Sequence, residues 1–169
     1  MFGNEERALL LTRSATFIAL IAAGAWISIP FFPVPLTLQT FFVLMAGVAM
    51  RRHAVLPAGG YLLLGALGLP VFHNGLAGIG VLFGPTGGYL LGFIPAAAVA
   101  GIAYEHPGPA VRLGGLACAS ALILGCGSCW LANTASLSLW SAFLAGTVPF
   151  LLGDTVKTVA AYFIGKHLK

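Results

Sequence analysis

The sequence predicts an all-α integral membrane protein with six transmembrane helices. Hydrophobic residues make up 59% of the chain and charged residues only 7%, whereas a soluble domain typically carries about 25% charged residues. The mean hydropathy is +1.00. Because a spanning helix needs about 20 residues, a chain of 169 residues holds at most about six short spans. We therefore expect a single transmembrane domain over residues 1–169, with no room for a soluble domain.

Apolar runs and the breaks between them define the six helices. The first break is the proline-rich and aromatic segment 30–35, because proline fixes φ and removes an amide donor. Segment 71–85 is apolar but rich in glycine, which favours a compact loop over a span. The expected helices cover residues 8–29, 38–50, 55–67, 86–104, 112–131 and 139–167.

The second and third of these helices are short for a membrane. About 13 residues cover only ~20 Å, against a hydrocarbon core of ~30 Å. Non-helical backbone at such depth must be buried in protein or line a cavity. We therefore expect the neighbouring loops to dip into the protein.

The basic residues predict the orientation. If the N-terminus is inside, every Lys and Arg outside the last apolar run falls in inner segments, and the three outer loops contain none. Such a bias is typical of cytoplasmic loops, so we expect a multi-pass protein of the cytoplasmic membrane with both termini cytoplasmic. The scattered basic residues argue against nucleic-acid binding. The inner residues are Arg7, Arg13, Arg51, Arg52, Arg112, Lys166 and Lys169.

Asp154 and Lys157 are the two charged side chains inside the last apolar run. An ionised side chain at membrane depth costs at least ~2.5–3.5 kcal/mol, so it usually has a partner or a task. The two residues are three apart and share one helix face. They either pair with each other to fix helix packing or bind a ligand. Because a buried pair barely repays its desolvation, ligand binding is favoured.

Three outer loops above this pair predict a ligand cavity that opens to the outside. A carboxylate can accept N–H donors from a urea-like group, and an ammonium can meet a carboxylate or carbonyl oxygen. Tyr89 and Gln39 also fit interfacial anchoring or interhelical hydrogen bonds, and His73 fits a loop surface. The polar candidates are Thr37, Gln39, Asn74, Thr86, Tyr89, Asn133, Asp154 and Lys157, with Trp26, Phe32, Phe72 and Phe83 as possible aromatic walls.

Two ladders of small residues predict close helix contacts. Ala15, Ala19 and Ala23 allow another helix to approach the first expected helix, either within the chain or from a partner protein. A glycine ladder at 84, 88 and 92 fits packing within the chain, and the C-x-x-C at 126–129 fits a helix contact rather than redox chemistry.

The sequence contains no G-x-x-x-x-G-K-[ST] motif for nucleotide phosphates and no H-E-x-x-H motif for zinc. It also has no His, Cys and carboxylate cluster with metal-ligand spacing, and it is short of acid–base pairs for catalysis. These features favour a binding protein over an enzyme, with no metal.

Three segments in order resemble the BioY family, the biotin-specific substrate-binding (S) components of energy-coupling-factor (ECF) transporters. They are PVPLTLQ at 33–39, GPTGGYLLGF at 84–93 and GDTVK at 153–157. The resemblance covers nearly the whole chain and implies a six-helix S-component fold. It implies high-affinity biotin binding near the outer surface and uptake of biotin as the transported ligand, without a cofactor.

The resemblance also implies roles for individual residues. Asp154 and Lys157 would contact the polar groups of biotin, Tyr89 and Asn74 would lie at or near the pocket, and the first outer loop would act as a lid. Thr37, Gln39, Thr86, Gly87 and Gly88 fall in the matching segments and are expected in the binding site. The ladder of Ala15, Ala19 and Ala23 resembles the surface that docks on the transmembrane coupling subunit, while separate ATPase subunits hydrolyse ATP.

The chain departs from the family at His73 and Asn74, where members often have glycine and alanine. It also has no arginine near the fourth expected helix to bind a carboxylate. Other readings stay open: a solitary BioY that works without an ECF module, a different vitamin, a small intramembrane enzyme that uses Asp154 or the C-x-x-C, and a purely structural protein.

Overall fold

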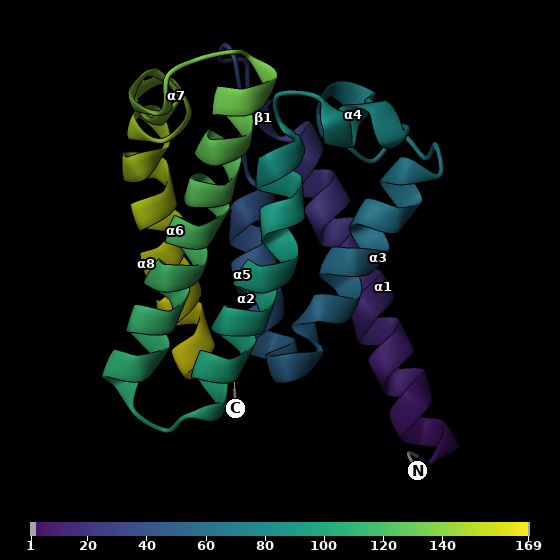
Figure 1. The fold of residues 1–169 in the computed structure, drawn as a ribbon. Helices are drawn as coiled ribbons and strands as arrows, with labels where there is room; N and C mark the ends of the chain where they lie inside the picture. The colour runs from purple at the N-terminus through teal and green to yellow at the C-terminus, as the bar shows by residue number, and fades with distance from the viewer. Residues whose placement is uncertain (1–2, 169) are drawn as a thin grey trace.

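The computed structural model describes residues 3–168, which fold into a bundle of helices (Figure 1). The long helices run along one common direction, and short elements cover one end of the bundle. In chain order the elements are α1 (Asn4–Trp26), β1 (Ser28–Ile29), β2 (Leu36–Thr37), α2 (Gln39–Met50), η1 (Arg51–Ala54), α3 (Val55–Ala66), η2 (His73–Gly75), α4 (Ile79–Phe83), α5 (Gly87–Glu105), α6 (Pro109–Thr134), α7 (Leu139–Gly146), η3 (Val148–Phe150) and α8 (Leu151–His167).

The prediction of six membrane helices is confirmed by α1, α2, α3, α5, α6 and α8. Within residues 3–168, five stretches are long and apolar enough to cross a membrane, and one of them, Gln39–Ala66, contains both α2 and α3. In Figure 1 the chain descends through α2, turns at η1 and rises through α3, so this stretch is a helical hairpin. Each arm has 12 residues, which is about 18 Å of helix.

Local interactions of the backbone and of proline determine where α1 ends and where α6 begins. α1 stops at Trp26, three residues before the expected end, because Ser28 and Ile29 pair with Thr37 and Leu36 in a small antiparallel hairpin. α6 starts at Pro109, earlier than expected, because proline suits the first helical position, where no amide donor is needed. The expected loop at 71–85 is largely irregular and contains only the short η2 and α4.

The last expected helix, 139–167, is wrong as a single helix. The chain leaves helical geometry at Thr147 (φ −122°, ψ −52°) and restarts as α8 at Leu151. Pro149 has no amide hydrogen to continue the helix, and its ring disfavours helical geometry before it. In Figure 1, α7 is seen nearly end-on while α8 runs along the bundle, so α7 lies across the end where the outer loops gather.

Glycine lets α5 and α6 approach closely. A Cβ at Gly88 would collide with Trp130, and a Cβ at Gly92 would press against Ile123 and Cys126. The indole Nε1 of Trp130 donates to the Gly84 carbonyl at 3.0 Å. The glycine ladder at 84, 88 and 92 therefore packs within the chain, as predicted.

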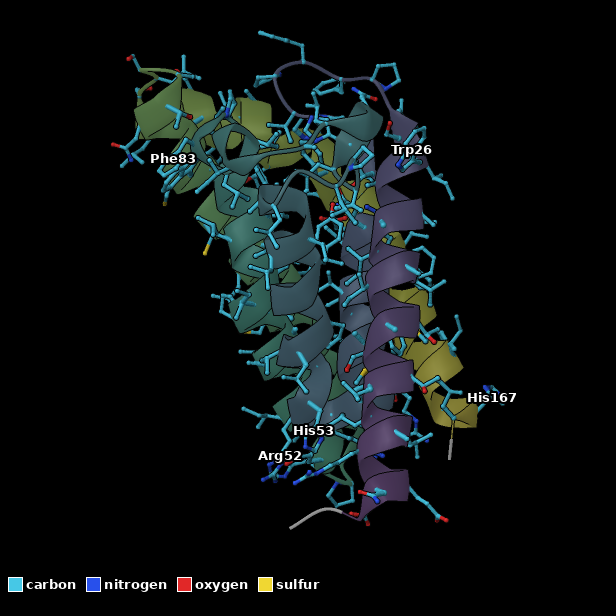
Figure 2. All side chains as sticks on the ribbon, turned by 90° about the vertical axis from the view of Figure 1, so that its right-hand side faces the viewer. Trp26, Arg52, His53, Phe83 and His167 are labelled. Atoms are coloured by element: carbon cyan, nitrogen blue, oxygen red, sulfur yellow. The ribbon has the colours of Figure 1, made fainter. Side chains whose placement is uncertain are left out.

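Charged side chains gather at the end of the bundle that carries both described termini. Figure 2 shows Arg52, His53 and His167 at this end and Trp26 and Phe83 at the other. Arg52 meets the Glu105 carboxylate with two hydrogen bonds, from Nε and Nη2, each of 2.7 Å. This ion pair joins η1 to the end of α5. The segregation agrees with the charge pattern of the sequence, which predicts that this end faces the cytoplasm.

Substituting alanine for Gly101 tests the contact between α5 and η1. An added Cβ would collide with the backbone carbonyl of Arg51, so we expect Gly101→Ala to lose about 1–3 kcal/mol of stability. Gly114→Ala on α6 is the matched control, because its Cβ would meet no atom within 4 Å. Thermal unfolding in detergent measures both variants. Equal midpoints for the two variants would show that α5 and η1 are not in close contact.

Candidate functional site

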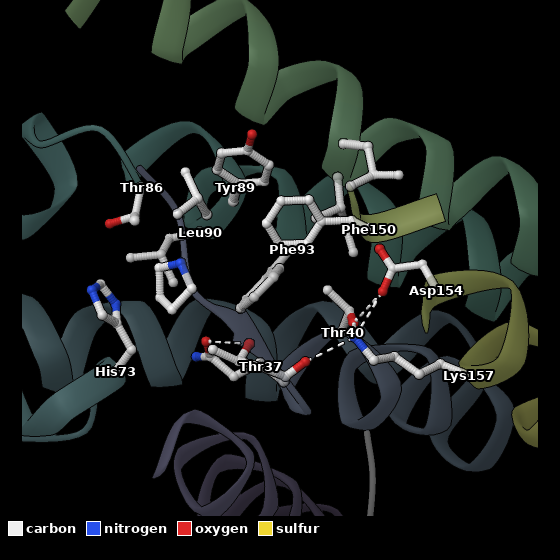
Figure 3. A pocket seen from close by; sticks show the side chains of 15 residues that line it. Thr37, Thr40, His73, Thr86, Tyr89, Leu90, Phe93, Phe150, Asp154 and Lys157 are labelled. Carbon is white, nitrogen blue, oxygen red and sulfur yellow. Dashed lines mark hydrogen bonds and ion pairs between the residues drawn. The ribbon is translucent and has the colours of Figure 1, made fainter. Parts of the chain in front are cut away.

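A cavity lies inside the bundle beneath the first outer loop, between α2, α5, α6 and α8 (Figure 3). Its apolar wall is formed by Val34, Pro35, Leu90, Phe93, Ile123, Leu124 and Phe150. Its polar lining consists of Thr37, Gln39, Thr40, His73, Thr86, Tyr89, Asp154 and Lys157. A mostly apolar wall with a few placed polar groups is typical of small-molecule sites.

The cavity is narrow. It leaves about 40 Å³ free, enough for a few water molecules at about 10–15 Å³ each. Small-molecule pockets usually measure about 300–1,000 Å³. Outside it lies a wider vestibule of about 380 Å³, formed by residues 30–33 of the first loop with Pro35, His73 and Asn74. Pro35 and His73 line both spaces, so the cavity and the vestibule adjoin at the first loop and η2.

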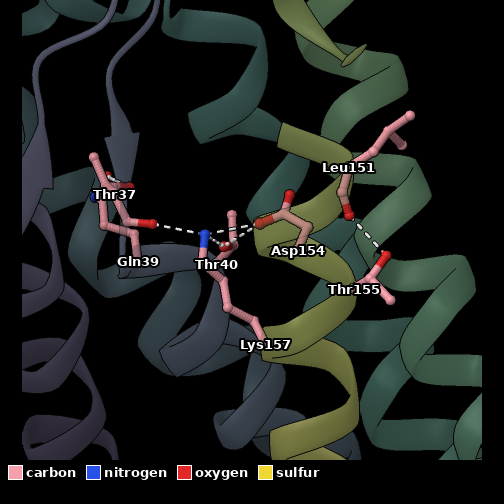
Figure 4. A network of polar contacts seen from close by, with 7 residues as sticks. All are labelled: Thr37, Gln39, Thr40, Leu151, Asp154, Thr155 and Lys157. Atoms are coloured by element: carbon pink, nitrogen blue, oxygen red, sulfur yellow. Dashed lines mark hydrogen bonds and ion pairs between the residues drawn. The ribbon is translucent and has the colours of Figure 1, made fainter. Parts of the chain in front are cut away.

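The polar end of the cavity is an ion pair. The Lys157 ammonium lies 2.8 Å from Oδ1 of Asp154, and the exposed side-chain fractions are only 15% and 4%. The ammonium also donates to the Thr37 carbonyl at 2.8 Å and to Oγ1 of Thr40 at 2.9 Å (Figure 4). An ammonium has three donors, so Lys157 is fully satisfied by α8, α2 and the base of the hairpin.

Only one of the two oxygens of the Asp154 carboxylate, Oδ1, forms hydrogen bonds within the described residues. Its Oδ1 accepts from Lys157 and, at 3.1 Å, from the Thr40 hydroxyl. Oδ2 makes no hydrogen bond within residues 3–168, and no buried side-chain oxygen or nitrogen in that range lacks a partner. Oδ2 therefore keeps solvent access and can accept an N–H donor. The break at Pro149 places Asp154 in the first turn of α8, where the helix dipole favours a negative charge.

Gln39 belongs to a second polar chain. The Thr37 hydroxyl donates to its Oε1 at 3.0 Å, its Nε2 donates to the Tyr61 hydroxyl, and Tyr61 donates to the Val71 carbonyl at 3.0 Å. This chain joins the hairpin, α2, α3 and the segment before η2. Gln39 thus makes the interhelical bonds considered from the sequence and also lines the cavity.

Tyr89 has a similar double position. Its hydroxyl points away from the cavity and donates to the Gly146 carbonyl at 2.7 Å, which ties α5 to the end of α7. Its ring lines the cavity and packs near Phe150, with centroids 6.2 Å apart. Gly127 and Gly146 make room for this tyrosine, because a Cβ at either would collide with it.

Some residues expected in the site lie outside the cavity. Gly87 and Gly88 are buried in the first turn of α5 and pack against Leu82 and Trp130. Asn74 is exposed in a left-handed conformation (φ 55°) and borders the vestibule instead. Asn133 is also absent from the lining and donates to the carbonyl four residues earlier in its own helix.

None of the four possible aromatic walls lines the cavity itself. Trp26, Phe32 and Phe83 are 64%, 92% and 68% exposed, and Phe72 is fully buried against Tyr61 instead. The rings of Trp26, Phe32 and Phe83 are exposed, and the ring of Phe72 packs in the core. The aromatic lining comes from Tyr89, Phe93 and Phe150.

Two polar residues of the cavity had been missed. Thr40 follows the first matching segment directly, but its contact with Asp154, 114 positions later, has no local signal. His73 had been interpreted as a loop-surface residue. It is half-buried and lines the cavity, and burial lowers the pKa of its imidazole.

The alanine ladder of α1 does not pack within the described chain. Ala15, Ala19 and Ala23 are all exposed. Only 17% of the apolar window of α1 is buried, against 67% for α5. For the described residues, the ladder therefore does not make the contact with another helix of the same chain that the sequence left open.

Comparisons with known proteins agree on one family. A model of the BioY family matches residues 4–169. The chain is 41% identical to the biotin transporter BioY of Thermotoga maritima over 165 residues, which cover 94% of this chain and 95% of that one. It is 39% identical to the probable biotin transporter BioY of Pyrococcus horikoshii over 156 residues, or 92% and 93% of the two chains.

A solved structure has the same fold. It is the crystal structure of the S-component for biotin from an ECF-type ABC transporter, and it superposes with a TM-score of 0.88. The two chains are 26% identical, and the match covers 99% of this chain and 94% of the other.

Breaking the buried ion pair is expected to destabilise the fold. Lys157→Met leaves the Asp154 carboxylate without its cation, which typically costs about 3–5 kcal/mol. The double variant Asp154→Asn/Lys157→Met removes both charges and is expected to recover most of that loss. Lys166→Met is the control on the same helix, because Lys166 is exposed.

Thermal unfolding without ligand measures these variants together with Asp154→Asn alone. The losses of Asp154→Asn and Lys157→Met are summed for comparison with the double variant. A double variant that loses the full sum would show that the two charges are not coupled.

Proposed function

Because the chain belongs to the BioY family, we propose that it binds biotin with high affinity and serves in its uptake across the cell membrane. In this proposal it is the S component of an ECF transporter, and residues 1–169 form one transmembrane substrate-binding domain. It is a transport protein rather than an enzyme, and biotin is its transported ligand rather than a cofactor.

The observation that carries this proposal is the buried ion pair at the end of the cavity. The ureido ring of biotin has two N–H donors and one carbonyl oxygen. Oδ2 of Asp154 has free capacity to accept an N–H, and the Thr40 hydroxyl and Lys157 ammonium lie beside it. Hydrogen bonds to charged groups contribute about 1.5–3 kcal/mol each, which suits tight binding of a small polar ring.

The apolar wall suits the rest of the ligand. Leu90, Phe93 and Phe150 line the space next to the pair and would bury the fused rings and the aliphatic chain. Thr37 and Gln39 line the cavity at the base of the hairpin, and Thr86 lines it at the start of α5. The first outer loop would act as the lid, because the cavity and the vestibule adjoin at this loop.

The proposed protein partners are a transmembrane coupling subunit and separate ATPase subunits. Its sequence has no phosphate-binding G-x-x-x-x-G-K-[ST] motif, so ATP hydrolysis would belong to separate ATPase subunits. The exposed ladder of Ala15, Ala19 and Ala23 would dock on the transmembrane coupling subunit, since small residues let helices approach closely. The charged end with both termini would face the cytoplasm.

Isothermal titration of the purified protein with biotin, desthiobiotin and lipoate tests the ligand. We expect binding of the two ligands with a ureido ring and none of lipoate, which lacks it. Asp154→Asn should weaken biotin binding by roughly 10- to 150-fold, the effect of about 1.5–3 kcal/mol.

Thr155→Val is the matched control for the titration. Thr155 is adjacent to Asp154 in the sequence, but its hydroxyl bonds to the Leu151 carbonyl at 2.7 Å and points away from the pair. Unchanged affinity in Asp154→Asn would place the ligand elsewhere, and a wild-type protein that does not bind biotin would refute the proposed function.

Substituting tryptophan for Ala19 tests the docking surface. In cells that also carry the coupling and ATPase subunits, Ala19→Trp should lower biotin uptake at least tenfold without changing biotin affinity. Gly114→Trp is the control, because Gly114 is exposed on α6 with open space around it. Normal uptake by Ala19→Trp would exclude this docking surface, and uptake that persists without the ATPase subunits would favour a solitary transporter.

A further inference from the structure

We propose that His73 forms an anion subsite at the outer end of the cavity and binds the carboxylate of the ligand there. This inference rests on the proposed function and adds a residue that determines which ligands fit. It concerns the end of the cavity opposite the Asp154–Lys157 pair.

The cavity has two polar ends and an apolar middle. Figure 3 shows Asp154 and Lys157 at one end and His73 and Thr86 at the other, with Leu90 and Phe93 between them. A ligand that fills this space needs a polar group at each end and an aliphatic part between them. Biotin has this pattern, with the ureido ring at one end and the carboxylate at the other.

His73 lies at the outer end of the cavity, where the carboxylate of the bound ligand would be. It lines both the cavity and the vestibule of about 380 Å³ outside it. Its imidazole is half-buried and makes no hydrogen bond or ion pair to any other side chain or carbonyl described for residues 3–168. One ring nitrogen of a neutral imidazole, or both of a charged one, can therefore donate to a ligand.

The backbone holds His73 firmly in this place. The preceding residue, Phe72, is fully buried and packs on Tyr61 with ring centroids 5.5 Å apart. The Phe72 amide also donates to the Leu76 carbonyl at 3.1 Å, which closes the turn around η2. An anchored turn loses little conformational freedom when its side chain binds a ligand.

Other cationic groups are not available to the carboxylate. No arginine is among the described residues that line the cavity, and the three donors of Lys157 already have partners. The Thr86 hydroxyl is a suitable second donor, because it lines the same end, has no side-chain hydrogen bond as the N-cap of α5 and lies at the positive end of that helix.

The subsite makes binding depend on pH. Burial lowers the pKa of His73 below its ordinary value, so the free protein carries a neutral imidazole at neutral pH. A bound carboxylate favours the charged form and raises that pKa, so the ligand and a proton bind together. Affinity is therefore highest below the pKa of the free protein and declines as the pH rises through the pKa of the complex.

The other titratable side chains around the cavity are few. α5 contributes Tyr89, and α8 contributes the paired Asp154 and Lys157, whereas the described lining from α2, α6 and the first loop contributes none. Within the described residues of the vestibule, His73 is the titratable side chain. A carboxylate-dependent pH effect near neutrality is therefore assigned to His73.

Titration of biotin against biotinamide, whose carboxylate is a neutral amide, isolates the subsite. We expect His73→Gln to weaken biotin about tenfold, or about 1.4 kcal/mol, and to change biotinamide by less than twofold. From about pH 8 to about pH 6, biotin should bind progressively more tightly to the wild type but not to His73→Gln. His106→Gln makes the same change in the turn after α5, at the other end of the bundle, and should alter nothing.

His73→Arg keeps a cation that does not titrate near neutrality. It should retain the preference for biotin over biotinamide and lose the pH dependence. If His73→Gln weakens both ligands equally, or if the pH dependence persists in His73→Arg, the anion subsite is refuted although biotin still binds. A wild-type protein that binds neither ligand would instead refute the proposed function.

Discussion

The site depends on one constraint: the buried ammonium of Lys157 must have a hydrogen-bond acceptor for each of its three N–H groups. Its three hydrogen bonds reach Asp154 on its own helix, Thr40 on α2 and the Thr37 carbonyl at the base of the hairpin. A charge at membrane depth is tolerable only with such partners. The hydrogen bonds of one lysine therefore fix α8 against α2 and hold the strand in which the first loop ends.

The same network joins the ion pair to the base of the first loop. Oδ1 of Asp154 accepts hydrogen bonds from Lys157 and Thr40, while Oδ2 has no partner within residues 3–168 and can accept one from a ligand. A ureido N–H can therefore be added without breaking the ion pair, so binding does not have to repay the cost of two separated buried charges. Because Lys157 also donates to the carbonyl of Thr37, the ion pair is connected to the strand in which the first loop ends.

Much of this arrangement could be predicted from local sequence patterns. Two charges in an apolar run identified Asp154 and Lys157, and the proline-rich segment 30–35 marked the first outer loop. The break in the last helix was missed, although Pro149 was a visible signal. Thr40 and His73 were missed because their positions depend on contacts between distant segments. Helix periodicity and composition carry no information about such contacts. Whether the alanine ladder on α1 packs within the chain could not be decided from the sequence, because the answer depends on whether these residues are exposed in the fold.

A crystal structure of the protein with bound biotin tests the central claim most directly. It should show Nζ of Lys157 still in hydrogen-bond contact with Oδ1 of Asp154, and a ureido N–H of biotin donating to Oδ2. The aliphatic part of the ligand should lie along Phe93. Biotin outside this cavity, or an Asp154–Lys157 pair that has separated to admit it, would contradict the account.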